Sequence, residues 1–108
     1  MKFVYTTYPS KKVSDKIALE TIEKKLAVCV DSWKISSQFP WREKIEKVDQ
    51  YMTLFTTDGE RFRALKEYIA TTHPYEVPLI AESDIHINEK YRHWAEDIFH
   101  DREQHLTQ

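Results

Sequence analysis

Strand-like and helix-like segments alternate along this chain in the order strand, helix, strand, strand, helix, strand, and a final helix follows. Runs rich in β-branched and aromatic residues indicate the strands, and apolar residues at intervals of three or four positions indicate the helices. This order restricts the chain to a single four-stranded sheet with helices packed against it. We therefore predict an α+β fold.

Cap, turn and proline signals set the expected boundaries. Ser10 is expected to cap the first helix and Asn88 the third, because short polar side chains accept free backbone N–H groups. Thr57 and Glu60 have the spacing of a capping box before the second helix, which should end before Pro74. The predicted strands are 3–7, 27–35, 45–57 and 79–85, the first helix is 10–26, and a bend is expected over 36–43.

This arrangement is the ferredoxin-like βαββαβ pattern with an extra C-terminal helix, and its two crossover helices cover one face of the sheet. The other face should be polar in a monomer, yet the strands carry apolar residues on both faces. In the second predicted strand, Val28 and Val30 point opposite to Cys29 and Trp33. The final helix can cover part of the second face, and we expect self-association to cover the rest.

Length and composition exclude several classes of protein. The 108 residues suit one domain over 1–108, with the polar segment 102–108 expected to fray. A net charge of −2 disfavours nucleic-acid binding, and a single glycine, Gly59, excludes Gly-rich phosphate loops. The lone cysteine, Cys29, cannot form an internal disulfide, and no apolar run suits a signal peptide or a membrane span. These features predict a cytoplasmic protein without nucleic-acid or membrane partners.

The most unusual segment contains His73, Tyr75 and Glu76, which Pro74 and Pro78 hold extended. An imidazole, a phenol and a carboxylate on a stiff loop can bind a metal ion or a small polar ligand. The same segment can instead be a rigid connector between a helix and a strand. The residues alone leave both interpretations open.

Other candidate residues also have a functional and a structural interpretation. Cys29 can be a soft metal ligand or a buried small side chain within a strand. Trp41, in the predicted bend, can line a pocket or pack locally. The polar face of the final helix has metal-ligand spacing but is more typical of a solvated surface; its residues are His93, Glu96, Asp97 and His100. The sequence contains no recognisable nucleophile–base set, so we predict no catalytic residue.

Six motifs occur in order along the chain: Thr7-Tyr8-Pro9, Leu26-Ala27-Val28-Cys29-Val30, Phe39-Pro40-Trp41 with Lys44-Ile45-Glu46, the strand 50–57, the block His73-Pro74-Tyr75-Glu76-Val77-Pro78, and Tyr91-x-x-Trp94. Together they resemble the CutA family of divalent-cation tolerance proteins. The resemblance extends from Phe3 to Trp94, and the block 73–78 is its most specific part.

This resemblance implies a PII-like homotrimer built by contacts between sheets, with clefts between subunits as the working surface. It implies binding of copper or another divalent ion, no organic cofactor and no enzymatic activity. His73 is the implied metal ligand, and Glu76 and Cys29 are the further ligands that we predict. The residues predicted for the ligand cleft are Trp41, Tyr75 and Lys44.

Three residues depart from the family pattern: Glu43, Thr56 and Leu79 replace a common glycine, lysine and acidic residue. Glu43 bears on the bend, because glutamate tolerates positive φ poorly. Other functions stay open. The chain can be a PII-like module for a small anionic effector, which needs basic residues such as Lys44 at the cleft. It can also be a trimeric scaffold without a ligand, or an enzyme that uses the histidine of the block as acid or base.

Overall fold

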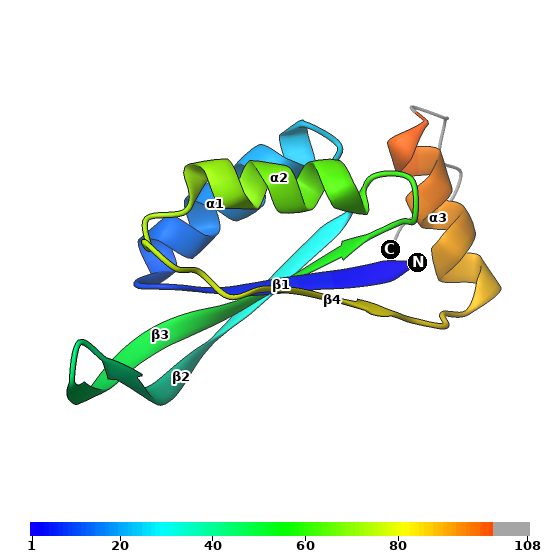
Figure 1. Cartoon of the computed structure of the whole chain (residues 1–108). Helices are drawn as coiled ribbons and strands as arrows, with labels where there is room; N and C mark the ends of the chain where they lie inside the picture. The colour runs from blue at the N-terminus through cyan, green and yellow to red at the C-terminus, as the bar shows by residue number, and fades with distance from the viewer. Residues whose placement is uncertain (101–108) are drawn as a thin grey trace.

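Four antiparallel strands form one sheet in the order β2-β3-β1-β4, and three helices pack against it (Figure 1). The elements are β1 (Lys2–Tyr8), α1 (Lys11–Glu23), β2 (Cys29–Trp41), β3 (Lys44–Thr57), α2 (Phe62–Thr72), β4 (Ile80–Asp84) and α3 (Glu89–Phe99). This computed structural model describes residues 1–100. The α+β class and the predicted order of elements are confirmed. The predicted fraying of 102–108 lies outside the described residues.

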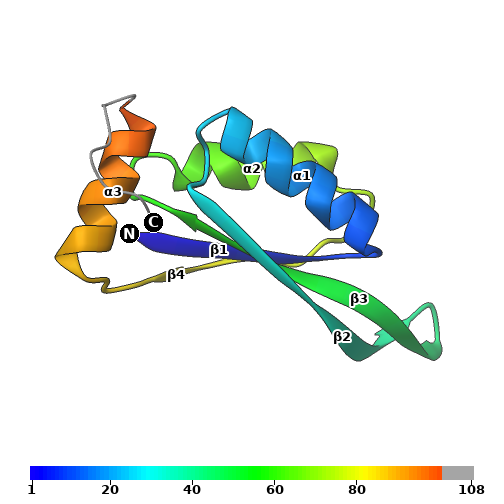
Figure 2. The same cartoon turned by 180° about the vertical axis from the view of Figure 1, so that it is seen from behind.

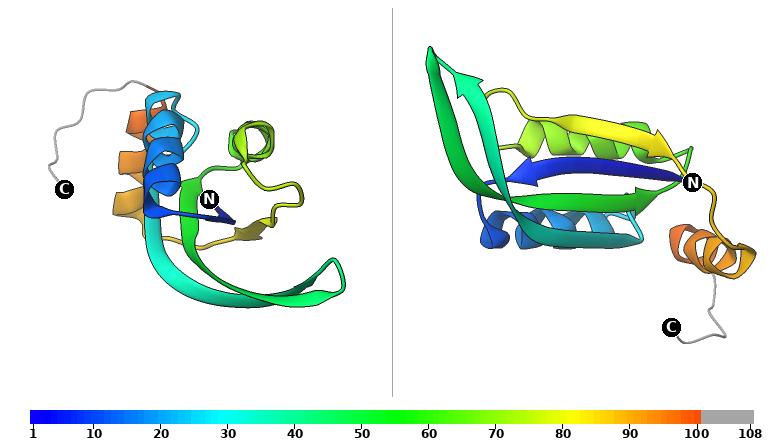
Figure 3. Two further views of the ribbon diagram at one scale, coloured as in Figure 1. Left: turned by 90° about the vertical axis from the view of Figure 1, so that its left-hand side faces the viewer. Right: turned by 90° about the horizontal axis from the view of Figure 1, so that it is seen from below.

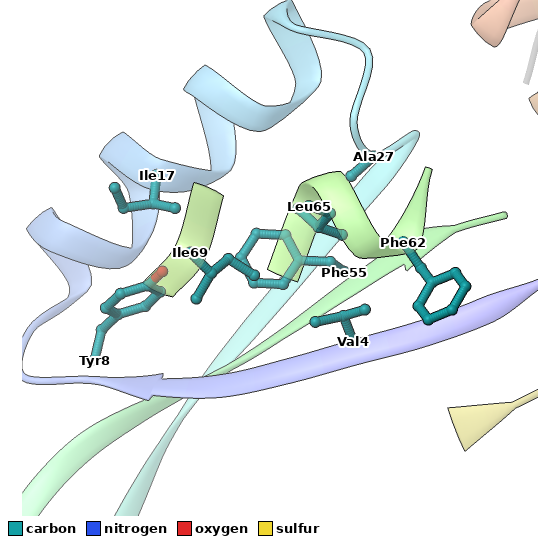
Figure 4. Close-up of a cluster of buried hydrophobic side chains, with 8 residues drawn as sticks. All are labelled: Val4, Tyr8, Ile17, Ala27, Phe55, Phe62, Leu65 and Ile69. Carbon is teal, nitrogen blue, oxygen red and sulfur yellow. The ribbon is translucent and has the colours of Figure 1, made fainter. Parts of the chain in front are cut away.

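The helices α1 and α2 lie side by side on one face of the sheet, as opposite views show (Figures 1 and 2). Strand alternation directs Val4, Tyr8 and Phe55 to this face, where they are fully buried. From α2, Leu65 and Ile69 pack onto them at helical spacing, and each such side chain contributes about 1.5–3 kcal/mol on burial. The whole cluster, drawn in Figure 4, is Val4, Tyr8, Ile17, Ala27, Phe55, Phe62, Leu65 and Ile69.

The last helix, α3, lies at one end of the sheet rather than across it (Figure 2). Its residues Ala95 and Phe99 pack with Val28 in a second apolar cluster, as the apolar stripe of the sequence predicts. The Arg61 guanidinium lies 4.4 Å from the centre of the Phe99 ring and donates to the Phe99 carbonyl oxygen at 3.4 Å. Among residues 1–100, no helix is long and apolar enough to cross a membrane.

The other face of the sheet has no helix in front of its strands (Figure 3, right panel). We call it the uncovered face, and its apolar side chains, placed by strand register, are Phe3, Tyr5, Trp33, Ile35, Met52 and Leu54. Trp33 remains 48% exposed, and the others are half-buried. The prediction of apolar residues on both faces is therefore confirmed. The helix α3 packs against Val28 and Cys29 at one end of the sheet and leaves the rest of this face open.

The predicted bend over 36–43 is wrong, because β2 continues to Trp41 and pairs with β3 as far as Trp41 and Lys44. Pro40 does not interrupt β2, since β2 is an edge strand and an edge tolerates a residue without an N–H. The chain reverses through Arg42 and Glu43 at φ of 48° and 70°, which is the left-handed geometry of a tight hairpin turn. Glu43 thus adopts the positive φ that its side chain disfavours.

The helix caps agree with the sequence at two of three predicted positions, and one of these two lacks the expected side-chain bond. Ser10 caps α1, and its Oγ accepts the Val13 N–H at 3.2 Å. The capping box is wrong: the Asp58 carboxylate, not the predicted Thr57 hydroxyl, accepts the N–H groups at the start of α2. Thr57 instead bonds to a backbone carbonyl before β2. Asn88 stands at the predicted cap position of α3, but its side chain makes no cap hydrogen bond.

Two further boundaries differ from the prediction. The first helix ends at Glu23 rather than at residue 26, because Lys25 adopts a left-handed φ of 57° that a helix cannot continue through. The strand expected to begin at residue 27 begins at Cys29. The second helix ends before His73, as predicted from the proline that follows it.

Candidate functional site

The β2–β3 hairpin is much longer than the rest of the sheet. The last residue of β1, Tyr8, pairs with Tyr51, so β2 and β3 continue beyond it with no further neighbour. We call this two-stranded extension the arm (residues 35–50). It bends away from the helices and forms one end of the molecule (Figures 1 and 3). The arm therefore presents side chains that the described core does not cover.

The tip of the arm is tied to the segment between α2 and β4, which we call the proline loop (residues 73–79). Arg42 Nη2 lies 3.2 Å from Glu76 Oε2, and the Arg42 guanidinium lies 5.3 Å from the centre of the Trp41 ring. Nearer the sheet, the Tyr75 hydroxyl donates to Gln50 Oε1 at 2.8 Å. These two bonds join the proline loop to the arm at separate points.

A groove of about 780 Å³ lies between the arm and the proline loop. Its apolar lining includes Ile35, Phe39, Val48, Met52, Val77 and Leu79. Trp41, Tyr75 and Glu76 also line it, so residues from two distant parts of the sequence meet there within one chain. Lys44 pairs with Trp41 beside the turn, and neither Lys44 nor His73 lines the groove.

The charged groups that line the groove are all acidic. They are the carboxylates of Glu46, Asp49 and Glu76, and no lysine, arginine or histidine among the described residues lines it. Lys34 Nζ lies 3.5 Å from Asp49, so two of the three carboxylates have a basic neighbour outside the lining. Within the described chain, the groove therefore favours a cation or a neutral ligand over an anion.

Both ring nitrogens of His73 have partners within the fold. Nδ1 accepts the backbone N–H of Tyr75 at 3.1 Å, and Nε2 lies 3.0 Å from Thr6 Oγ1. Thr6 Oγ1 in turn donates to the Leu79 carbonyl oxygen at 2.6 Å. The imidazole stacks on the Tyr8 ring, with centres 4.6 Å apart and planes 18° apart. His73 is thus held by β1 and by both ends of the proline loop.

These bonds define the protonation state of His73. The Tyr75 N–H can only donate, so Nδ1 carries a lone pair and the proton of the neutral ring sits on Nε2. Burial lowers the pKa of His73, and a hydrogen bond with the Thr7 backbone opposes this effect. His73 is therefore a neutral imidazole at neutral pH.

Cys29 lies at the opposite end of the sheet. It pairs with Thr56, which also pairs with Phe3, whereas His73 stacks on Tyr8 at the other end of β1. The five residue-to-residue steps along β1 from Phe3 to Tyr8 span about 16 Å. The Cys29 Sγ lies 3.7 Å from an Asp31 carboxylate oxygen, and burial first, then Asp31, raises the pKa of the thiol. The structure does not bring Cys29 together with His73 and Glu76.

No cluster of metal-binding side chains occurs in the described part of the chain. Among residues 1–100, no three His, Cys, Asp or Glu side chains come close enough to hold one ion. On α3, Glu96 accepts from Arg92 at 2.6 Å, which agrees with the interpretation of that face as a solvated surface.

Two residues of this region were not predicted from the sequence. Thr6 joins His73 to the proline loop, and Gln50, which is 6% exposed, accepts the Tyr75 hydroxyl. The alternation of strand 3–7 places Thr6 on the same face as Val4, which identifies it as a buried hydroxyl in need of a partner. Gln50 gives no such signal, because its partner is distant in sequence.

Sequence comparison relates the chain to one family. A family model described as CutA1 divalent ion tolerance protein matches residues 2–98. The divalent-cation tolerance protein CutA of Thermococcus kodakarensis is 34% identical over 92 residues, which cover 84% of this chain and 88% of that protein. Mouse protein CutA is 32% identical over 96 residues, which cover 87% of this chain and 54% of that protein.

Solved structures show the same fold. The periplasmic divalent cation tolerance protein CutA from Archaeoglobus fulgidus superposes with a TM-score of 0.86 at 31% identity, covering 92% of this chain and 99% of the other. CutA1 from Pyrococcus horikoshii superposes with a TM-score of 0.87 at 28% identity, covering 91% and 97% of the two chains. The similarity therefore includes both the sheet and its helices.

Proposed function

The chain belongs to the CutA1 divalent ion tolerance protein family, and from this membership we propose that it binds divalent cations, copper among them, as a PII-like homotrimer. The uncovered face is the observation that carries the proposal. Six large apolar side chains lie on it, and the described helices leave them accessible. A contiguous apolar patch of this kind is rare on a monomer and typical of an interface. Further copies of the chain supply the missing cover.

The proposal places the ion in a cleft between subunits. The arm extends beyond the sheet, and a neighbouring subunit that packs on the uncovered face lies beside the groove. The groove lining contributes the carboxylates of Glu46, Asp49 and Glu76, and carboxylates are ligands for divalent ions. Glu76 is the side chain of the proline loop that is open to such an ion, at 69% exposure. The remaining ligands come from the neighbour.

The sequence also predicts His73 and Cys29 as ligands, but each would need a defined change before it could coordinate. His73 must give up its bond to the Tyr75 N–H or to Thr6. Cys29 must lose a proton that burial and Asp31 hold in place. Their position at opposite ends of the sheet means that, within a subunit, they serve separate sites.

Assembly is tested by light scattering after size exclusion. We expect the wild type to elute as a trimer, and Trp33→Glu, which puts a charge on the uncovered face, to elute as smaller species. Lys12→Glu, an exposed substitution on α1, is the matched control and should remain trimeric. A monodisperse monomer in dilute wild-type solution would refute the assembly and the cleft between subunits.

Ion binding is tested by titrating the metal-free protein with Cu²⁺ and with Zn²⁺ while following its melting temperature. Binding to the native state must raise that temperature by mass action. We expect a rise for the wild type, a smaller rise for Glu76→Gln, and an unchanged rise for His93→Ala, an exposed histidine on α3. His73→Ala and Cys29→Ser test the other two predicted ligands. No rise in the wild type at millimolar ion would remove the ion-binding proposal.

A small anionic effector is the alternative, and a rise in melting temperature with phosphate or ATP but not with metal ions would favour it. The proposal includes no catalytic step, and turnover of any substrate that disappears in His73→Ala would contradict it. A cytoplasmic location is also part of the proposal, and it is supported by the single cysteine. One relative is named as periplasmic, so family membership alone does not assign the compartment.

A further inference from the structure

His73 belongs to the most distinctive motif of the chain, and its surroundings give it a role other than metal binding. We propose that His73 is a positioning residue that locks the proline loop onto β1, and that it does not coordinate the ion. The lock itself is independent of ion binding. Only its relevance to the ion cleft rests on the proposed function, because the proline loop borders that cleft.

The first half of the lock is local. The bond from the Tyr75 N–H to His73 Nδ1 joins residues two positions apart, across Pro74. It has the form of a side-chain turn, in which a polar side chain accepts the N–H two residues later. This bond fixes the direction in which the chain leaves α2 and therefore where the Tyr75 ring points.

The second half of the lock is long-range. The Nε2–H of His73 donates to Thr6 Oγ1, and the Thr6 hydroxyl in turn donates to the Leu79 carbonyl oxygen. Leu79 is the last residue of the proline loop, so one relay joins the start of the loop, the strand β1 and the end of the loop. Stacking on Tyr8, which is fully buried, sets the plane of the imidazole.

The lock reaches the groove through two neighbours of His73. The Tyr75 hydroxyl bonds to Gln50 on β3, and Glu76 pairs with Arg42 at the tip of the arm. Release of His73 therefore frees the loop that holds both contacts. By this route His73 sets the position of groove-lining residues without lining the groove itself.

Coordination and locking exclude each other at both nitrogens. An ion on Nδ1 needs the lone pair that accepts the Tyr75 N–H, and an ion on Nε2 must replace the proton given to Thr6. No pair of carboxylate or thiol groups within residues 1–100 completes a site around the ring. Both ring nitrogens of His73 therefore have hydrogen-bond partners within the fold when no ion is bound.

Hydrogen exchange of the Tyr75 amide in the assembled protein tests the lock. We expect about tenfold faster exchange in His73→Ala, which removes both bonds. Thr6→Val and His73→Asn each lose only the bond between residue 73 and Thr6 and keep an acceptor for the Tyr75 N–H, so both should exchange about threefold faster than the wild type. Thr6→Ser keeps the hydroxyl and should match the wild type. His93→Ala is the control. Unchanged exchange in both His73→Ala and Thr6→Val would overturn the lock.

The second measurement is a Zn²⁺ titration of the same variants, read by the change in melting temperature. We expect His73→Asn to keep its apparent affinity within about threefold of the wild type, because the loop stays in place. A loss of tenfold or more in His73→Asn, with Tyr75 exchange still slow, would show that His73 is a ligand and overturn the proposal. If the wild type itself does not respond to ions, ion binding fails while the exchange data still decide the lock.

Discussion

The two faces of the sheet are made by the same strands but have different surroundings. On the helix-covered face, Val4 and Phe55 have no exposed surface, whereas Trp33 on the uncovered face is 48% exposed. Alternation along each strand supplies apolar residues to both faces, and only one layer of crossover helices is available to cover them. The described chain therefore covers one face of its sheet with helices and leaves apolar side chains accessible on the other.

The covered face also tolerates many hydroxyl groups, because each has a partner. Ser14 Oγ lies 2.8 Å from Thr53 Oγ1, and Thr57 donates to the Leu26 carbonyl at 2.8 Å. Among the described residues the exception is the Tyr8 hydroxyl, which is buried without a hydrogen-bond partner. The covered face is thus a closed interior in which the Tyr8 hydroxyl is the one buried polar group without a partner among the described residues. The uncovered face remains open to solvent.

The largest effects should separate the two faces. Leu65→Ala on the covered face creates a cavity in the core and should cost about 2–5 kcal/mol of unfolding free energy. This loss should not depend on protein concentration. Met52→Ala on the uncovered face should instead act through assembly, so its effect on the urea midpoint should change with protein concentration. If both variants lost the same unfolding free energy at every protein concentration, the two faces would not differ in their role in assembly.

The pH dependence of stability tests the buried side of the proline loop. The pKa of His73 is lowered from its ordinary 6.5, so below pH 6.5 the unfolded chain takes up more protons than the native one. The free energy of unfolding should therefore be at its full value above pH 6.5 and fall as the pH drops below it.

Denaturation at a series of pH values measures this fall, and His73→Asn should remove it. Glu82 and Glu89, whose pKa values are lowered from 4.5 by Lys66 and Arg92 respectively, lose their contribution only in a more acidic range. A fall between pH 6.5 and 5 that persists in His73→Asn would assign the effect to another group.

Removal of the Tyr8 hydroxyl tests whether this buried group destabilises the covered face. Tyr8→Phe keeps the ring that packs on His73 and deletes a buried oxygen without a partner. We expect stability to be unchanged or to rise by up to about 1 kcal/mol, because desolvation of the hydroxyl is no longer required. A loss above that size in chemical denaturation would reveal a hydrogen bond of the Tyr8 hydroxyl in solution.

The smallest effect is expected at the tip of the arm. Arg42 and Glu76 are 72% and 69% exposed, and an ion pair so open to water is worth less than about 1 kcal/mol. Arg42→Ala should leave the melting temperature of the protein almost unchanged and should reduce its dependence on salt. A large loss of stability would mean that this pair is buried by a neighbouring subunit.

Much of the fold could be predicted from the sequence, because local signals agree with the final packing. Ser10 begins a helix, the Leu65 and Ile69 stripe faces inward, and the chain stops being helical before His73. The sequence failed where a tertiary contact outweighed a local preference. Pro40 argues for a bend and Glu43 argues against a positive φ, but pairing with β3 carries β2 through Pro40 and turns the chain tightly at Glu43.

The candidate site was predicted in part for the same reason. Trp41 and Tyr75 were expected at one cleft, and the hairpin and the proline loop do bring them together. Cys29 was grouped with His73 by chemistry alone, and strand register places it at the other end of the sheet. A list of metal-binding residue types contains no information on distance.

The sequence by itself determined which residues are apolar, which segments are strands and helices, and that one layer of helices is too little cover for two apolar faces. Only the tertiary structure decided how those segments are used: which face stays open, how far the arm extends, and that both nitrogens of His73 are already bonded. The physical reason is that periodicity and capping depend on neighbours along the chain. Hydrogen bonds such as those from His73 to Thr6 and from Thr6 to Leu79 instead join residues whose separation is fixed only when the sheet has formed.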